Sequence, residues 1–229
     1  SHGTATNTLG YEPGQIAFRR TADDRNYQSG GFAAVGGPLT LQLSAATSAA
    51  THGLPCRLTL GSPFSSHAVD MRNGFALGSS SGANVFNIRA YGPVPSTISG
   101  QLTGGSASSP WTVGGDGILV LTNTSNSFIG RIAIEQGAML RVGAPGALGA
   151  TSELYYEASR SLKGTLDLNG QTVTGVKIKG KGEFWGPLAT AGIINTSTNT
   201  ATWGDATAAS AIDLTQNTEG SIGHDTNAY

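Results

Sequence analysis

The sequence predicts an all-β protein, and more specifically a parallel β-helix or solenoid of short strands. Three observations support this fold class: apolar residues alternate with polar ones at a period of two, helical spacing is nearly absent, and one stretch occurs twice. A β-sandwich or jelly roll remains the alternative, because those folds also use short alternating strands separated by turns. The 229 residues can bury a sizeable core as one elongated β domain, residues 1–229.

The stretch that occurs twice opens with RLTLGSP at residues 57–63 and with MLRVGAP at residues 139–145. In each copy an Asn-Gly pair follows, and another apolar pair comes after a similar interval. Self-similarity of this kind is typical of a stacked array, in which each repeat buries the face of its neighbour. We therefore expect repeat-like units at residues 36–100 and 114–196, with atypical flanks at residues 1–35 and 204–229.

The two Asn-Gly pairs, Asn73-Gly74 and Asn169-Gly170, are strong turn signals because both residue types tolerate positive φ. Such a turn reverses the chain in a hairpin, whereas in a solenoid it makes a corner between successive faces. Their corresponding positions in the two copies favour equivalent corners of stacked coils. The same alignment places Leu58/Leu60 and Leu140/Val142 in the same type of core layer.

The strands are expected where apolar residues alternate over four to six residues and Gly, Asn, Ser or Pro follows. In chain order the apolar positions are Leu39/Leu41/Leu43, Leu58/Leu60, Phe86/Ile88, Leu119/Leu121, Ile132/Ile134, Leu140/Val142, Leu166/Leu168, Val176/Ile178 and Ile212/Leu214. The segment Ala144–Ala158 carries a proline, glycines and no sustained apolar stripe, so we expect a loop with one helical turn there.

Composition indicates an extracellular β-structure and excludes several functions. Glycine makes up 34 of 229 residues and charged residues only 12%, roughly twice and half their usual shares of about 7% and 25%. A net charge of −1 provides no basic face for nucleic acid. Lys177, Lys179 and Lys181 fit one solvated strand face, and no apolar run is long enough to insert into a membrane.

Residues 98–149 carry a family resemblance. Residues 98–105 (ISGQLTGG), 115–130 (GDGILVLTNTSNSFIG) and 134–149 (IEQGAMLRVGAPGALG) resemble the autotransporter-associated β-strand repeat of bacterial surface proteins. The Asn-aromatic-x-Gly corner of that pattern corresponds to residues 126–130, one residue off its commonest spacing. The resemblance implies a parallel β-helix in the exported part of a surface-displayed protein. It implies no single activity, because function on such scaffolds depends on individual sites.

Carboxylates are the first candidates for catalysis, since polysaccharide hydrolases and lyases on β-helices use them in pairs. Asp23-Asp24 is one such pair, and Asp167, Glu183 and Asp205 could add others. With 14 acidic residues in the chain, such pairs also arise by chance. We expect Asp23-Asp24 to form surface ion pairs with Arg19, Arg20 or Arg25 instead.

Motifs for metals, phosphates and nucleophiles are missing. Gly114-Gly115-Asp116-Gly117 lacks the glycine order of calcium-binding β-rolls and fits a turn. Residues 180–186 have the wrong glycine order for a dinucleotide site, and the single Cys56 fits a small buried residue at a strand start. Other weak signals are the scattered His2, His52, His67 and His224, the sequons at Asn123 and Asn195, and Trp111, Trp185 and Trp203, for which core or corner packing is favoured over sugar stacking.

Together these observations predict a non-enzymatic extracellular structural protein, secreted or displayed at the cell surface as part of a bacterial fibre or filament, stalk or adhesin. The alternative is a polysaccharide-active enzyme or carbohydrate-binding module on the same β-helix. We expect no catalytic, cofactor-binding or metal site and no cofactor. The open ends of a short solenoid expose unpaired strand edges, so we expect a homo-oligomer assembled end to end through the N-terminal segment or the strand Ala211–Thr215. Contact with a surface glycan or a host substratum is a further possibility.

The inward and outward assignments also give a stability prediction. Leu166→Asp should unfold the chain, because an unpaired carboxylate in the core costs several kcal/mol. Lys179→Ser should change little, because a solvated lysine contributes within about 0.5 kcal/mol.

Overall fold

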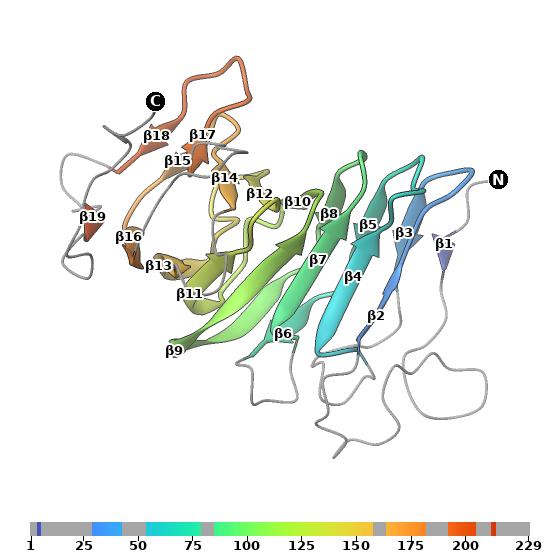
Figure 1. Cartoon of the computed structure of the whole chain (residues 1–229), viewed down its shortest axis with the longest axis horizontal. Coiled ribbons are helices and arrows are strands. Elements are labelled where there is room, and N and C mark those ends of the chain that lie inside the picture. The colour runs from blue at the N-terminus through green and yellow to red at the C-terminus, as the bar shows by residue number, and fades with distance from the viewer. Residues whose placement is uncertain are drawn as a thin grey trace, which may run out of the picture.

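The computed structural model is a β-solenoid of stacked parallel strands, as the sequence predicts (Figure 1). It describes residues 4–5, 29–42, 54–78, 85–157, 164–181, 192–204 and 212–213, and no helix occurs among them. Every pairing between named strands is parallel. This arrangement excludes the antiparallel sandwich and jelly roll that the sequence left open.

One wall of the solenoid is an eight-stranded sheet in the order β1-β3-β5-β8-β10-β12-β14-β17. Its strands occur in chain order, so each coil adds one strand beside the last. They are β1 (Thr4–Ala5), β3 (Leu39–Leu41), β5 (Val69–Met71), β8 (Ser96–Ile98), β10 (Ile118–Leu121), β12 (Met139–Val142), β14 (Thr165–Asp167) and β17 (Ile193–Ile194).

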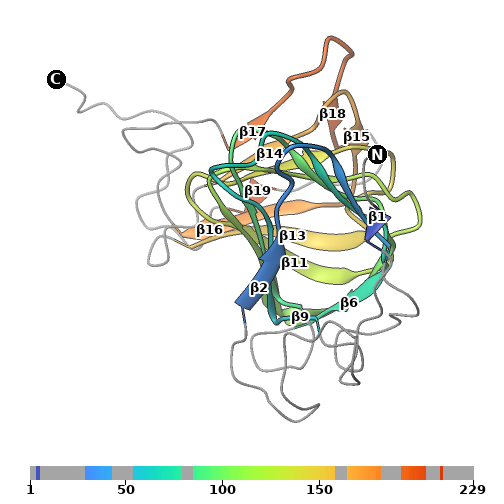
Figure 2. The same ribbon diagram turned by 90° about the vertical axis from the view of Figure 1, so that its right-hand side faces the viewer.

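The opposite wall is a nine-stranded sheet in the order β19-β16-β13-β11-β9-β7-β4-β2, with β6 paired to β9 beside that path. Viewed along the solenoid, its strands curve around the core and face the other wall (Figure 2). Its strands are β2 (Ser29–Phe32), β4 (Arg57–Gly61), β6 (Phe75–Leu77), β7 (Asn87–Tyr91), β9 (Leu102–Gly115), β11 (Ile129–Ile134), β13 (Ala150–Glu157), β16 (Lys177–Lys181) and β19 (Ile212–Asp213). A two-stranded sheet joins β15 (Thr172–Val173) to β18 (Thr202–Trp203).

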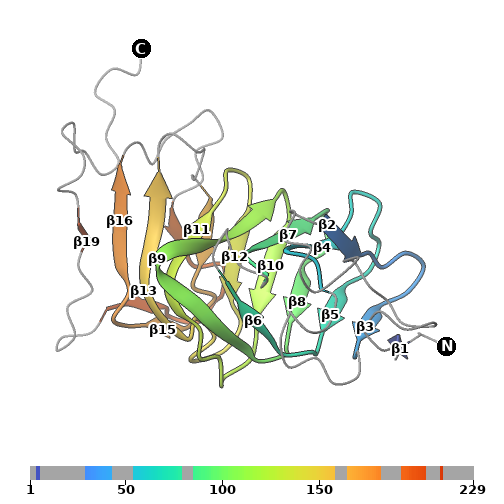
Figure 3. The same cartoon turned by 90° about the horizontal axis from the view of Figure 1, so that it is seen from below.

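The core consists of apolar rows that run along the solenoid, one residue per coil. In the eight-stranded sheet Leu119 is in register with Leu140, Leu140 with Leu166, and Leu166 with Ile193. The three leucines are fully buried, and burying a side chain of this size contributes about 1.5–3 kcal/mol. Successive strands lie side by side along the solenoid, which brings these rows together (Figure 3). The apolar residues that alternate at a period of two within each strand therefore point into the core, where they stack on the apolar residues of the next coil.

A large aromatic pair fills the core where the ladder is irregular. Trp111 of β9 and Phe128 are both buried, with ring centroids 5.5 Å apart and an interplanar angle of 85°, an edge-to-face geometry that aromatic rings favour. Beside them, the register between β9 and β11 shifts between Gly130 and Ile132. The two aromatic rings lie in the coil in which β9 has extra residues between Ser106 and Trp111 relative to β11.

The two Asn-Gly pairs both follow strands of the eight-stranded sheet, β5 and β14, so their equivalent corner position is confirmed. Their conformations differ. Asn169 and Gly170 have φ values of 48° and 75°, whereas neither Asn73 nor Gly74 has a positive φ. Only the second corner therefore uses the left-handed conformation that makes Asn-Gly a turn signal.

The predicted common layer for Leu58/Leu60 and Leu140/Val142 is wrong. Leu58 and Leu60 lie in β4 of the nine-stranded sheet, whereas Leu140 and Val142 lie in β12 of the eight-stranded sheet. All four are buried, but they enter the core from opposite walls. The shared Leu-x-Leu or Leu-x-Val sequence before glycine marks the end of a strand on either wall, so it does not specify the wall.

The segment Ala144–Ala158 is only partly a loop. A turn at residues 145–149 agrees with the prediction, but β13 begins at Ala150 and pairs with β11 and β16. The register shifts opposite Gly130/Arg131, so the buried residues Thr151 and Leu154 are three positions apart. This β-bulge interrupts the period of two by which the other strands could be found.

Candidate functional site

Asp167 is the one sequence-predicted carboxylate candidate that lies among the described residues. Asp23, Asp24, Glu183 and Asp205, with the arginines proposed to pair Asp23-Asp24, lie outside them. The Asp167 side chain has no exposed surface, and Arg141 Nε donates to its Oδ2 at 2.7 Å. Thr196 Oγ1 donates to the same oxygen at 2.6 Å, and the backbone N–H groups of Asn169 and Thr196 donate to Oδ1 at 3.0 Å. Asp167 thus connects three successive coils.

The hydrogen bonds around Asp167 determine its charge state. Burial alone would raise the pKa of this carboxyl, but the hydrogen bonds from Thr196 and Arg141 and from the two backbone amides outweigh it. The pKa of Asp167 is therefore lowered from its ordinary value of 3.8. A general acid in glycoside hydrolysis needs a raised pKa, so this carboxylate suits an anchor between coils.

Arginine also pairs with three other carboxylates on the outside of the solenoid. Among the described residues, Arg72 lies 3.1 Å from Asp70, Arg131 2.6 Å from Glu153, and Arg89 3.4 Å from Glu135. These side chains are 17–56% exposed, more than Asp167. Arg131 and Glu153 are register partners on the adjacent strands β11 and β13, whereas Arg72 and Asp70 are two positions apart in one coil. Arg89 of β7 reaches Glu135 across Gly114 of β9. In each pair the two charges neutralise one another.

The Arg89–Glu135 pair belongs to a larger polar network on the nine-stranded sheet. Arg89 donates to Asn87 Oδ1 and to Tyr91 Oη, both at 3.2 Å, and Asn87 Nδ2 donates to Glu135 Oε1 at 3.3 Å. The hydrogen bond to Tyr91 raises the pKa of Arg89 despite partial burial. A Cβ on Gly114 would come within 2.3 Å of Glu135 Oε2, so this glycine makes room for the carboxylate.

The two described tryptophans, Trp111 and Trp203, pack against the core. Trp111 is 1% exposed, and Trp203 of β18 is a partly buried residue packed on the core. For both, the predicted core or corner packing is confirmed. Trp185 lies outside the described residues.

The histidines and the Gly-Gly-Asp-Gly motif were the sequence candidates for metal binding. Among the described residues, no three His, Cys, Asp or Glu side chains are placed to hold a metal ion. Of the histidines, His67 Nδ1 lies 2.8 Å from Ser66 Oγ, while His2, His52 and His224 are outside the described residues. Asp116 makes a bend between β9 and β10 and accepts a hydrogen bond from Gly92 N at 3.3 Å, as a turn predicts.

The remaining sequence candidates have mixed outcomes. Cys56, the single cysteine of the chain, is 1% exposed, as expected for a small residue at a strand start. The side-chain amides of both sequons make hydrogen bonds: Asn123 Nδ2 donates to Ser99 O at 2.8 Å and Asn195 Nδ2 to Asn199 O at 2.9 Å. Lys177 is exposed, whereas the side chains of Lys179 and Lys181 and residues 182–186 lie outside the described part. No helix in the described part is long and apolar enough to cross a membrane.

Asn126 is a corner residue whose role sequence reasoning missed. Its Oδ1 accepts from Leu102 N, and its Nδ2 donates to Ala147 O, both at 2.7 Å. One side chain therefore bridges the coils before and after its own. An asparagine at a corner next to a buried aromatic is the signal that could have revealed this.

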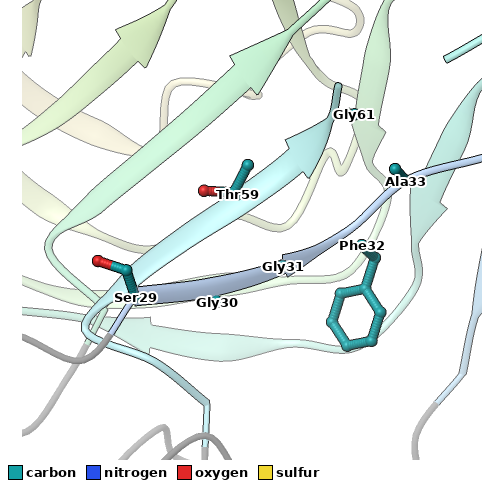
Figure 4. A pocket seen from close by; sticks show the side chains of 7 residues that line it. All are labelled: Ser29, Gly30, Gly31, Phe32, Ala33, Thr59 and Gly61. Atoms are coloured by element: carbon teal, nitrogen blue, oxygen red, sulfur yellow. The ribbon is translucent and has the colours of Figure 1, made fainter. Parts of the chain in front are cut away.

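The first coil ends in the strand β2, and a hollow of about 350 Å³ lies beside it. Five consecutive residues, 29–33, line the hollow together with Thr59 and Gly61 of β4 (Figure 4). Two large apolar side chains are exposed in the adjoining loops, Val35 at 70% and Phe64 at 84%. This end of the solenoid therefore exposes apolar side chains, whereas the walls carry the arginine–carboxylate pairs described above.

Comparisons with protein-family models, curated proteins and solved structures find no match to this chain. The geometry of the chain itself is therefore the basis for assigning a function. Two features are distinctive. Charged side chains form ion pairs along the walls, and each sheet ends in a strand with a described neighbour on one side only.

Proposed function

We propose that this chain is a non-enzymatic structural protein of the bacterial cell surface, a subunit of an extracellular fibre, stalk or adhesin that assembles end to end. The observation that carries the proposal is the parallel stacking of the coils. Each sheet begins and ends in a strand that has a described neighbour on one side only. A solenoid with two such ends is a segment that further copies can extend.

The surroundings of the carboxylates favour a structural role over the alternative of a polysaccharide-active enzyme. Catalysis on glycosides requires two carboxyl groups that face a sugar from both sides of the scissile bond. Asp70, Glu135, Glu153 and Asp167 each lie within 3.4 Å of an arginine nitrogen. Three of these pairs, all except Asp70–Arg72, connect residues of different coils, as a structural segment requires.

The composition supports an extracellular location. Only 12% of the residues are charged, and the outer surface relies on Ser, Thr, Asn and Gln. The core rows and the hydrogen-bonded ladders hold the chain together without a disulfide, because Cys56 is its single cysteine. The resemblance to the autotransporter-associated β-strand repeat agrees with this location.

The test of this function is the state of the purified chain. Electron microscopy should show fibres or short rods, and the mass from light scattering should rise with protein concentration. Deleting residues 1–15, which include β1, should reduce that mass because it removes one end strand. A folded chain that stays monomeric at high concentration would refute assembly.

A further inference from the structure

Three loops at one corner of the solenoid expose apolar side chains. Each connects a strand of the nine-stranded sheet to the next strand of the eight-stranded sheet, and all three lie along the upper edge of the molecule in Figure 1. We call these loops the apolar ridge: residues 33–38 between β2 and β3, 62–68 between β4 and β5, and 92–95 between β7 and β8. Val35 is 70% exposed and Phe64 84%. In the third loop Val94 is partly exposed between two prolines.

Backbone contacts hold the three loops against one another. Ser66 N donates to Ala34 O at 3.2 Å, and Gly36 N donates to Ser66 Oγ at the same distance. A Cβ on Gly92 would come within 2.2 Å of the backbone oxygen of Ser62, so the third loop lies directly on the second. The ridge is therefore one continuous surface.

The turn that carries Phe64 is fixed by its own hydrogen bonds. Ser62 N donates to Ser65 Oγ at 2.8 Å, and Phe64 N donates to Ser62 Oγ at 3.2 Å. A hydrogen bond from Ser65 N to Ser62 O at 2.9 Å closes the turn. The turn therefore fixes the backbone at Phe64, and a partner that covers the ring orders little additional backbone. Because both serine hydroxyls have partners within the turn, covering them leaves neither unpaired.

The fold does not require apolar residues at this corner. In the next two coils the same corner lies between β9 and β10 and between β11 and β12, and it exposes the polar side chains of Asp116 and Gln136. The loops of the ridge read AAVGGP, SPFSSHA and GPVP, with no Lys, Arg, Asp or Glu. A continuous exposed surface of this kind indicates an interaction site.

The order of the side chains along the ridge favours a second copy of this chain as the partner. The bulky Phe64 lies in the middle loop, and the loops on either side carry a valine each, Val35 and Val94. A two-fold axis beside the middle loop places Phe64 against Phe64, and Val35 of one copy against Val94 of the other. The ridge carries no Lys, Arg, Asp or Glu, so this contact buries no unpaired charge of those residues.

We propose that two copies of this chain pair side by side through the apolar ridge, with their Phe64 side chains in contact at a two-fold axis. A contact of three loops on each side fits the small class of interfaces, which form weak complexes. It closes after two copies and does not depend on the proposed end-to-end assembly. Where both contacts form, each subunit adds a further ridge to the contact between two filaments, which strengthens it.

Removal of the aromatic ring tests the contact. Phe64→Ser should fold like the parent because Phe64 is 84% exposed. Sedimentation velocity should show the parent changing from one copy to two with increasing concentration, and the dissociation constant of Phe64→Ser should be at least about tenfold higher. Ile129→Ser is the matched control: Ile129 is 48% exposed in β11, outside the ridge, and this variant should pair like the parent.

Cross-linking tests the position of the axis with Phe64 in place. A short bismaleimide should join Val35→Cys to Val94→Cys when the two variants are mixed, and either variant alone should give little dimer. Cys56 is present in every variant and is 1% exposed, so the parent should not react. Equal cross-linking of each variant with itself would overturn the two-fold arrangement.

The outcomes separate this contact from the proposed function. If the parent assembles and Phe64→Ser assembles equally well, the ridge contact is wrong while the structural function stands. If the parent stops at two copies and Phe64→Ser is a monomer, the ridge contact stands and end-to-end assembly is wrong. A folded parent that stays monomeric at high concentration refutes both. If that monomer binds neutral phosphatidylcholine vesicles and Phe64→Ser does not, the ridge contacts lipid and the second copy is the wrong partner.

Discussion

Arg141 Nε lies 2.7 Å from Oδ2 of Asp167, a carboxylate with no exposed surface that also accepts hydrogen bonds from the next coil. Arg141 belongs to β12 and Asp167 to β14, and their backbones are in register as neighbours in the eight-stranded sheet. The ion pair therefore forms between two residues whose backbones are also paired, so it stabilises the register of β12 against β14.

Replacing Asp167 by asparagine keeps the shape of the side chain but removes its charge. Loss of one partner of a buried pair costs about 3–5 kcal/mol, and because Arg141 is 23% exposed and retains some water, we expect about 2–3 kcal/mol at neutral pH. Asp70→Asn is the control, because its exposed pair with Arg72 should contribute about 0–1 kcal/mol. Urea titrations of the three proteins measure both values, and equal losses would contradict the anchor role of Asp167.

The stabilisation from Asp167 should disappear in acid. The pKa of this group is lower in the folded chain than its ordinary value of 3.8, so its contribution is fully present above that value. This contribution decreases as the pH falls from 3.8 to the lower pKa of the folded chain. In that range the unfolded chain binds a proton at Asp167 and the folded chain does not, so acid favours unfolding. The gap in unfolding free energy between parent and Asp167→Asn should stay constant from about pH 5 upward and narrow below pH 4. A gap that widens in acid would show the opposite sign.

Glycine at the corner before the β11 bulge is required for two reasons. Gly130 has a φ of 93°, and a Cβ there would lie 2.0 Å from the backbone oxygen of Ser106. Gly130→Ala should therefore cost more than the roughly 1–2 kcal/mol of left-handed strain alone. Gly175→Ala, with a φ of 71° and no atom within 4 Å, should show only the strain. Thermal melts that rank the two variants in reverse order would mean that the close stacking at Gly130 is wrong.

The sequence predicted the fold class because period-two alternation and coil stacking depend on the same residues. Rows such as Leu140 and Leu166 are visible as alternation within each strand. The wall on which a strand lies depends on the number of residues between strands, which a local pattern such as that at Leu58/Leu60 does not contain. For the same reason β13 was missed, since its bulge opposite Gly130 is a property of two strands together.

The candidate site was less predictable than the fold. Arg141 and Asp167 are distant in sequence, and only the register of β12 and β14 brings them together. The strand β2 lies in a flank with few strand signals, because Ser-Gly-Gly-Phe shows no apolar alternation. Its pairing depends on a partner, β4, that already has a strong pattern of its own.

The core assignment of Leu166 predicts a large difference between two substitutions in the same coil. Leu166 is fully buried, and Leu166→Asp should unfold the chain at room temperature because an unpaired buried carboxylate costs several kcal/mol. Lys177 is exposed, so Lys177→Ser should change stability by no more than about 0.5 kcal/mol. Circular dichroism melts compare the two, and similar melting temperatures would refute the inward and outward assignments.

Asn126 connects three coils through one side chain, and its removal tests how far single corner residues hold the stack together. Asn126→Ala leaves the backbone N–H of Leu102 and the backbone oxygen of Ala147, both buried residues, without the partners that lie at 2.7 Å, which should cost about 2 kcal/mol for the two hydrogen bonds. Gln101→Ala is the control, since this exposed side chain makes one hydrogen bond to Ser125 O in the same corner and should cost about 0.5 kcal/mol or less. Hydrogen exchange should show faster opening of Leu102 N in Asn126→Ala and unchanged rates in Gln101→Ala. If both variants exchange alike, the coils at this corner are held by the rows of Leu102 and Phe128 and not by the amide.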